Sequence, residues 1–283
     1  MAGVLVVGAS GFLGRAVATE LHDAGHRVVG TYCSTPTPRA GVEFDFWTDD
    51  VRALVGEHDV DAVVFAAAVE YGGEADTGAT AAGPGFERAV ARFARGCRDC
   101  RLVYISSAAV FDGIEGRYPE TAERSPIDEY GRRLVTAEDV VQEHCSDVAI
   151  LRTSYLFGFI GGRLDDRLAR TRDAVTEGEP VAYFDDMYKS PLLVTEAAEA
   201  VRALVESEAT GVVHAPAPRT SVYEFHRDAM AALGYDPSLV ERDSIPPDMN
   251  VAPDSSLSSD RFASLVGFEP SSVGSGLGDG RKR

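Results

Sequence analysis

Short runs of Val, Ile and other apolar residues alternate along the chain with longer stretches in which apolar positions recur every three or four residues. The short runs predict β-strands at 4–7, 27–32, 42–46, 62–68, 101–107 and 148–154. Between them, Leu13, Val17 and Leu21 have the spacing of one helix face, as do the apolar residues of 86–93. Strands and helices that alternate predict an α/β fold with a doubly wound parallel sheet.

The alternation loosens after residue 154. Helical patterns at 163–177, at 197–206 and from Ser221 to about Leu233 mix with short strands at 181–184 and 211–214, and Ser221 and Glu224 have the spacing of a capping box. We expect residues 1–154 and about 181–215 to form a dinucleotide-binding domain. Residues of about 155–180 and 216–270 then form a smaller substrate lobe over the carboxyl edge of the sheet. Residues 271–283, rich in Gly and Ser, are expected to be a disordered tail.

Composition narrows the range of partners. The chain has 283 residues with 45 Asp and Glu against 27 Lys and Arg, a formal net charge of -18. This charge repels nucleic acid and anionic membrane surfaces, so we expect neither as a partner. The longest apolar run, 62–69, is far shorter than the ~20 residues of a membrane span. Only two of the basic residues are lysines, a bias typical of proteins from salt-adapted (halophilic) microbes.

Cysteine and histidine usage predicts neither a disulfide framework nor a metal site. The four cysteines are sparse, and Cys97-x-x-Cys100 has no second ligand pair. The six histidines show no ligand spacing. Because the N-terminus also lacks the pattern of a signal peptide, we expect a protein of the reducing cytoplasm.

A glycine-rich turn joins the first strand to the first helix. In Gly8-x-x-Gly11-x-x-Gly14, the first glycine allows a tight turn, the second allows backbone N–H groups to approach a pyrophosphate, and the third allows helix and strand to pack closely. This context predicts Rossmann-like dinucleotide binding. The expected contacts also include the residues between the glycines, Ser10, Phe12 and Leu13.

The end of the second strand bears on the choice of cofactor. It lacks the acidic residue that would bind an adenosine 2′-hydroxyl and repel a 2′-phosphate, and it carries the hydroxyls of Thr31 and Ser34. We therefore expect NADP(H) to be preferred, with NAD(H) also allowed.

The spacing of the glycines resembles that of the extended short-chain dehydrogenase/reductases, and the segments 104–113 and 126–138 resemble the active-site core of the dTDP-4-dehydrorhamnose reductases. Segments 150–158, 185–191 and 253–257 agree with that family in order, so the resemblance covers roughly residues 3–270. It implies that Ser107 binds the substrate carbonyl and that Tyr130 donates a proton as hydride arrives from the nicotinamide. It further implies cofactor contacts by Asp45, Phe46, Ala66, Ala67, Ala68 and Tyr130.

The sequence departs from the family pattern Tyr-x-x-x-Lys, because Leu134 occupies the lysine position. The helix asparagine that usually supports this lysine falls near Pro84. Since a free tyrosine has a pKa of about 10, its neutral form remains available as an acid, and the loss should harm alcohol oxidation more than ketone reduction. Arg133 is a candidate replacement for the lysine, or else a solvated surface arginine.

Two functions follow from these observations. The first is an NADP(H)-dependent reductase of a 4-keto sugar nucleotide in deoxysugar or surface-glycan biosynthesis. The second is a catalytically impaired NADP-binding partner protein, similar to the regulatory β subunit of methionine adenosyltransferase. Arg163, Arg167 and Arg170 recur at helical spacing, either as cations for a substrate diphosphate or as a salt-bridged surface. The sequence leaves a homodimer open.

Overall fold

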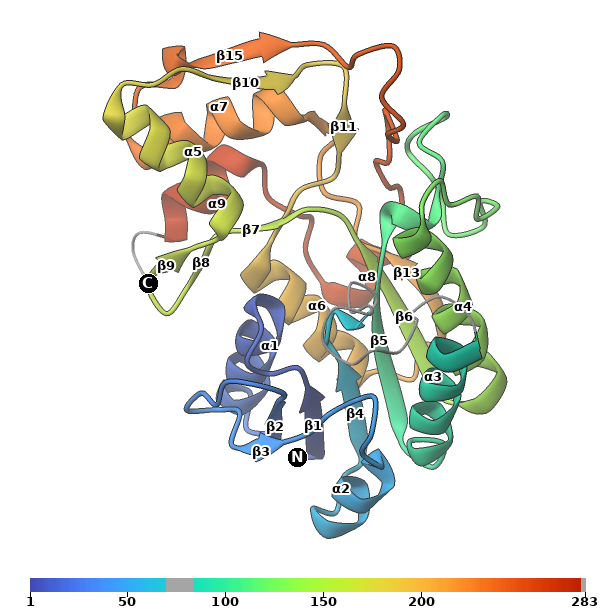
Figure 1. Ribbon diagram of the computed structural model, residues 1–283. Coiled ribbons are helices and arrows are strands. Elements are labelled where there is room, and N and C mark those ends of the chain that lie inside the picture. The colour runs from blue at the N-terminus through green and yellow to red at the C-terminus, as the bar shows by residue number, and fades with distance from the viewer. Residues whose placement is uncertain (70–83, 281–283) are drawn as a thin grey trace.

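A seven-stranded parallel sheet forms the larger part of the molecule, as the computed structural model in Figure 1 shows. The structure describes residues 1–69 and 84–280. The strand order is β3-β2-β1-β4-β5-β6-β13, which confirms the predicted Rossmann-like fold. The strands are β1 (Gly3–Val7), β2 (Arg27–Tyr32), β3 (Val42–Glu43), β4 (Ala62–Phe65), β5 (Arg101–Ser107), β6 (Val148–Thr153) and β13 (Gly211–His214).

Helices cover both faces of this sheet because successive strand residues point to opposite sides. Val4 and Val6 of β1 belong to a core shared with α1, α6 and α8, whereas Leu5 and Val7 belong to a core shared with α2, α3 and α4. The helices of the first face are α1 (Phe12–Asp23), α6 (Val194–Glu206) and α8 (Phe262–Val266). Those of the second face are α2 (Val51–Glu57), α3 (Pro84–Gly96) and α4 (Glu129–His144).

A smaller lobe lies beyond the carboxyl ends of the strands (Figure 1). Its core contains Phe157, Leu168, Phe225 and Leu277, packed between its helices. The predicted capping box is present: the Ser221 hydroxyl accepts a hydrogen bond from the Glu224 backbone N–H, and the Glu224 side chain accepts one from Ser221 N. The main elements of the lobe are α5 (Asp166–Glu177), α7 (Val222–Leu233), α9 (Val273–Gly280) and the parallel pair β10 (Val181–Phe184) and β15 (Val240–Asp243).

Short pairs and turns connect the two parts. The strand pairs are β7 (Leu156–Phe157) with β12 (Leu192–Leu193), β8 (Phe159–Ile160) with β9 (Arg163–Leu164), and β11 (Tyr188–Lys189) with β14 (Thr220–Ser221). Segments Ala108–Val110 and Pro237–Leu239 form 3₁₀ turns.

The boundary between the two parts differs from the expected one. Strand β10 pairs with β15, so residues 181–184 belong to the lobe and not to the dinucleotide-binding domain. Conversely, Phe262 of α8 is buried in the core of the sheet with α6, although it lies within the expected substrate lobe. Contacts between residues far apart in the sequence decide both cases, and the spacing of apolar residues within one element does not reveal such contacts.

The C-terminal segment also differs from the disordered tail that its composition predicts. Residues Val273–Gly280 form α9, in which Val273 and Leu277 are buried against the core that includes α7. These two apolar residues are spaced i, i+4 and therefore share one helix face. Tertiary packing thus outweighs the weak helix propensity of the glycines, while residues 281–283 lie outside the described part.

Candidate active site and cofactor cleft

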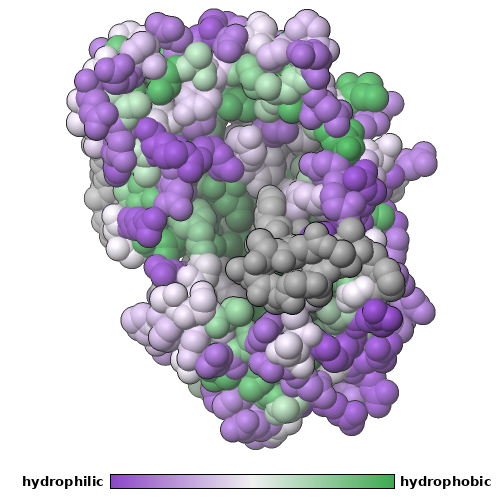
Figure 2. Space-filling view, in the orientation of Figure 1, coloured by the Kyte–Doolittle hydropathy of each residue, from purple (hydrophilic) through white to green (hydrophobic). Residues whose placement is uncertain are grey.

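A cleft of about 970 Å³ opens between the sheet and the smaller lobe. Figure 2 shows a hollow between the two parts, with hydrophobic side chains on its walls. The glycine turn, the ends of β4 and β5 and the first turn of α4 line one side, and residues of the lobe line the other. Ligands of open α/β sheets bind at this edge, where the strand order reverses.

The three glycines of the turn have different structural roles. Gly8 has a φ of +83°, and a Cβ there would come within 2.8 Å of the Ala67 Cα atom. A Cβ on Gly14 would lie 2.1 Å from the Gly8 carbonyl oxygen, so the packing of α1 on the turn requires this glycine. A Cβ on Gly11 would meet only that same oxygen, at 3.3 Å. The fold therefore accounts for Gly8 and Gly14, whereas Gly11 leaves room for a ligand that approaches the N-terminus of α1.

The structure divides the other predicted cofactor residues into two groups. Ser10, Phe12, Leu13, Ala66, Ala67 and Ala68 line the cleft with Gly8 and Gly11. Gly14, Thr31, Ser34, Asp45 and Phe46 are not part of the cleft lining.

Each predicted residue outside the lining has another position or partner. The Thr31 hydroxyl is buried and accepts a hydrogen bond from Gly8 N at 3.1 Å, so it supports the glycine turn from below. Ser34 is exposed. The Asp45 carboxylate accepts a hydrogen bond from Trp47 N at 2.8 Å, and Phe46 is buried among the aromatic rings of the core. Thr31 and Ser34 do not line the cleft, but Cys33, which lies between them in the sequence, does.

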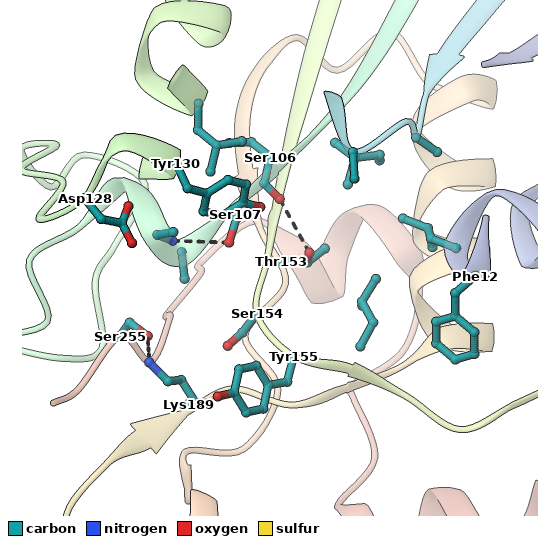
Figure 3. A pocket seen from close by; sticks show the side chains of 18 of the residues that line it. Phe12, Ser106, Ser107, Asp128, Tyr130, Thr153, Ser154, Tyr155, Lys189 and Ser255 are labelled. Atoms are coloured by element: carbon teal, nitrogen blue, oxygen red, sulfur yellow. Dashed lines mark hydrogen bonds between the residues drawn. The ribbon is translucent and has the colours of Figure 1, made fainter. Parts of the chain in front are cut away.

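Ser107 and Tyr130 come together from two elements (Figure 3). Ser107 is the last residue of β5, and its hydroxyl oxygen accepts a hydrogen bond from Ala109 N at 3.2 Å. Tyr130 lies in the first turn of α4, where Asp128 caps the helix by accepting from Gly131 N at 2.8 Å. A Cβ at Gly131 would lie 2.2 Å from Ala109 O, so this glycine allows α4 to approach the segment of Ser107. Ser107 and Tyr130 both line the cleft.

Arg133 and Leu134 lie three and four residues after Tyr130 on α4, at and next to the position of the family lysine. Leu134 is 1% exposed and packs in an apolar cluster with Val110 and Phe111. Arg133 is not among the residues that line the cleft. Its guanidinium lies 5.8 Å from the centroid of the Phe86 ring of α3, and its Nε atom lies 3.4 Å from Glu129 Oε1. The guanidinium of Arg133 is thus directed toward α3, and Arg133 does not line the cleft with Tyr130.

A buried charged network lies behind Ser107, and sequence reasoning missed it. Glu138 of α4 is fully buried and accepts hydrogen bonds from Ser106 Oγ at 2.6 Å and from Arg152 Nη2 at 2.5 Å. Arg152 Nη1 lies 3.2 Å from Nε2 of His214. Burial, with the positive charge of Arg152 as a second cause, lowers the pKa of His214 to about 4, so the imidazole is neutral. The network joins α4 to β5, β6 and β13.

Further polar groups of the cleft, from the end of β6 and from segments that follow it in the chain, were not predicted as site residues. Thr153, Ser154, Tyr155, Lys189, Asn250 and Ser255 all line the cleft. Of the three arginines singled out by helical spacing, Arg167 alone lines it. Arg163 is exposed and pairs with Asp166 at 2.7 Å. The only available signal was the match of segments 150–158 and 185–191 to the family pattern, which does not specify where a side chain points.

Neither a metal-binding cluster nor a membrane-spanning helix is found in the part of the chain that the structure describes. No three His, Cys, Asp or Glu side chains gather there as metal ligands. None of its helices is long and apolar enough to cross a membrane.

The fold and the cleft define a class, the Rossmann-like proteins with a smaller lobe at the carboxyl edge of the sheet. Residues 1–279 match the family described as the RmlD substrate binding domain. The chain belongs to this family.

Two curated relatives and one solved structure are similar to the chain. A "Probable low-salt glycan biosynthesis reductase" of Haloferax volcanii is 32% identical over 255 residues, with 83% of this chain and 82% of the relative covered. A dTDP-4-keto-6-deoxy-D-glucose reductase of Streptomyces niveus is 34% identical over 245 residues, with 83% and 80% covered. The solved structure of dTDP-4-dehydrorhamnose reductase from Bacillus anthracis in complex with NADP has a TM-score of 0.77 at 22% identity, with 98% of this chain and 97% of that chain covered.

Proposed function

We propose that this protein is an NADP(H)-dependent reductase of a 4-keto sugar nucleotide in deoxysugar or surface-glycan biosynthesis. The observation that carries the proposal is the placement of Ser107 and Tyr130 on the same cleft as the glycine turn, with room for a ligand at Gly11. The names of the two curated relatives, both reductases, support the reaction class. The NADP held by the solved relative supports the cofactor.

The chain's own residues supply binding and proton transfer. NADPH, when bound, supplies a hydride. Because the Ser107 oxygen accepts from Ala109 N, its O–H can donate to the ketone oxygen of the substrate. Tyr130 gives its phenolic proton to the same oxygen as the alcohol forms. Glu138 and Arg152 hold α4 against β5, which keeps the two hydroxyls on one wall of the cleft.

The absence of the family lysine on α4 is compatible with reduction. Reduction uses the neutral tyrosine, and at neutral pH a tyrosine with a pKa of about 10 is almost entirely neutral. Alcohol oxidation needs tyrosinate, which the apolar cluster around Leu134 does not stabilise. This same cluster favours the second candidate function, a cofactor-binding partner protein that does not turn substrate over.

Turnover of defined substrates tests the proposal. NADPH oxidation is followed by absorbance with dTDP-4-keto-6-deoxyglucose and with its UDP counterpart. We expect turnover by the wild type and a loss of about 10²–10⁴-fold in Tyr130→Phe, the usual contribution of general-acid catalysis. Tyr235→Phe, a tyrosine of the smaller lobe away from the cleft lining, is the matched control and should keep full activity.

Three other outcomes are informative. NADPH binding without turnover of either substrate would support the partner-protein function instead. Equal rates for Tyr130→Phe and wild type would show that another group donates the proton. Loss of activity in Tyr235→Phe would mean that removal of a tyrosine hydroxyl outside the cleft disturbs the enzyme.

A further inference from the structure

A lysine faces the cleft across from the two hydroxyls of the proposed reduction. Lys189 of β11 lines the same cleft as Ser107 and Tyr130. Figure 3 shows Lys189 across the pocket from these two residues, with Ser154 between them. A keto sugar whose ketone oxygen lies at Ser107 and Tyr130 therefore extends its ring toward Lys189.

The residue type at position 189 is uncommon in this chain. Only two of the 27 basic residues are lysines, and the other, Lys282, lies outside the described part. Arginine supplies the positive charge elsewhere, as in the buried pair of Arg152 with Glu138. Arginine keeps its proton at any physiological pH, whereas a buried lysine can lose it. Lys189 thus offers the cleft what an arginine cannot, an amine base.

The groups that contact Lys189 suit the neutral amine. Nζ donates to two neutral acceptors, Ser255 Oγ at 2.8 Å and Ala252 O at 3.4 Å, and lies 5.9 Å from the centroid of the Tyr155 ring. These two hydrogen bonds use two N–H groups, and in the amine the third position of the nitrogen is a lone pair. Asp128, whose carboxylate also lines the cleft, is engaged as the N-cap of α4.

Charged neighbours shift the protonation of Lys189 in both directions. Burial is the main cause that lowers its pKa to about 8, and the positive charge of Arg167 adds to the effect, although Arg167 itself interacts with Asp165. Asp254 opposes the shift, but its carboxylate accepts a hydrogen bond from Arg219 Nε at 2.7 Å. At pH 8, about half of the Lys189 side chains are therefore neutral, against less than about 1% for an ordinary lysine.

We propose that Lys189 is a catalytic base that removes a proton from the carbon next to the ketone of the bound sugar. This inference rests on the proposed function, because that function supplies the keto sugar. The C–H bond breaks, its electron pair forms the C=C bond of an enolate, and the proton goes to the lone pair of Nζ. The π electrons of the ketone move to its oxygen, which accepts hydrogen bonds from the hydroxyls of Ser107 and Tyr130.

The reverse step closes the cycle without another reactant. The ammonium of Lys189 exchanges its protons with water and returns one to the carbon, which restores the ketone. The activity is therefore the exchange of a carbon-bound hydrogen with solvent, and proton delivery to the opposite face of the enolate would give the epimer. No hydride takes part, so the step proceeds without NADPH and is separable from reduction.

Exchange in D₂O tests the proposal. The substrates dTDP-4-keto-6-deoxyglucose and its UDP counterpart are incubated with the protein in the absence of NADPH. Proton NMR follows the loss of the signals of the ring hydrogens next to the ketone, and a sample without protein gives the spontaneous rate. We expect the wild type to exceed this rate and Lys189→Met to lose about 10²–10⁴-fold of the excess, the usual contribution of a general base.

Lys189→Arg separates proton transfer from positive charge. The guanidinium keeps the charge but does not give up its proton, so this variant should lose exchange as Lys189→Met does. The matched control is Arg172→Met, which removes a cation of α5 that pairs with Asp173, and it should exchange like the wild type. Circular dichroism checks that each variant is folded.

The pH profile of the wild type gives a readout that a purely structural role of Lys189 would not produce. Because the neutral amine is the base, kcat/KM for exchange should rise with pH and level off above the pKa of about 8. A lysine with the ordinary pKa of 10.5 would instead let the rate rise toward that pH.

Several results would overturn the inference. They are wild-type exchange in Lys189→Met or Lys189→Arg, an equal loss in Arg172→Met, or a profile that continues to rise toward pH 10.5. Reduction of the ketone by the wild type without exchange would also refute the inference and leave the proposed function standing. Exchange that depends on Lys189, without reduction by NADPH, would refute only the function. Neither activity with either substrate would refute both.

Discussion

At the scale of single residues, this chain departs from the reductase pattern at position 134, where a leucine occupies the place of the family lysine. Leu134 lines the cleft and is also buried in the cluster with Val110 and Phe111. The guanidinium of Arg133, the candidate replacement for the lysine, lies over the Phe86 ring and does not line the cleft. Tyr130 is thus expected to act as an acid in reduction without a lysine on its helix.

Restoring the lysine tests this view. We expect Leu134→Lys to raise the rate, because an ammonium near Tyr130 stabilises tyrosinate and can contact the cofactor ribose. The gain should be larger for oxidation of the 4-hydroxyl product with NADP⁺ than for ketone reduction, since oxidation needs the basic form. Both directions are measured by absorbance of NADPH.

Leu134→Met keeps the size and apolar character of the side chain, so it serves as the control and should show no gain. An equal gain from Met and Lys would mean that looser packing, and not the charge, changes the rate. No gain from Lys in an active enzyme would mean that Tyr130 does not depend on a cation.

At the scale of elements, the glycine turn and α1 form one unit. Gly8 and Gly14 are required by the turn and by the approach of α1, whereas a side chain at Gly11 would meet only Gly8 O at 3.3 Å. The buried Thr31 hydroxyl of β2 supports this unit through Gly8 N. The fold therefore requires Gly8 and Gly14, whereas it leaves room at Gly11.

Gly11→Val should therefore abolish cofactor binding in a protein that remains folded, because the side chain fills the space where a pyrophosphate meets backbone N–H groups. Fluorescence titration with NADPH and NADH measures the loss. We expect the wild type to bind NADPH more tightly than NADH, since no acidic residue follows β2 to repel a 2′-phosphate.

The matched control is Gly56→Val in α2, where an added Cβ has no neighbour within 4 Å. It should bind both cofactors like the wild type. Unchanged NADPH affinity in folded Gly11→Val would show that the turn is only structural. A wild type that binds NADH as tightly as NADPH would contradict the cofactor preference.

At the scale of the whole molecule, each of the two parts contains a buried neutral histidine. His214 lies on β13 of the sheet, and His226 lies on α7 of the lobe. Burial is the main cause that lowers the pKa of His214 to about 4 and that of His226 to about 3, while the positive charges of Arg152 and Arg167 respectively add to it. The unfolded chain binds these protons near pH 6.5.

Stability should therefore fall as the pH is lowered from 6.5 toward 4. In that window the unfolded state binds a proton that the folded state does not, so each histidine contributes a slope of up to about 1.4 kcal/mol per pH unit, and its stabilisation is complete above pH 6.5. Urea unfolding at pH 7, 6 and 5 measures the free energy of unfolding.

His226→Gln should reduce this slope, and the same substitution at the exposed His22 serves as control and should leave it unchanged. A free energy of unfolding that does not change between pH 7 and 5 would contradict the prediction. The same holds for a His226→Gln variant with the wild-type slope.

The sequence by itself determined the features that depend on local spacing. The order of strands and helices, the glycine turn between β1 and α1, and the capping box at Ser221 all follow from patterns within a few residues. The sequence also singled out Ser107 and Tyr130, because each lies within a short segment that resembles the family's active-site pattern. Their chemical roles stay predictions that the proposed experiments test.

Only the tertiary structure decided which side chains meet. Lys189 and Arg167 approach Tyr155 from different elements, and no local pattern specifies that approach. Helical spacing placed Arg133 near Tyr130, yet the packing of α4 on α3 directs it to Phe86. The same applies to α9, whose Gly-rich sequence forms a helix because Leu277 is buried against the lobe. Periodicity fixes the face of an element, but the direction of a side chain and its partners depend on contacts between residues far apart in the chain.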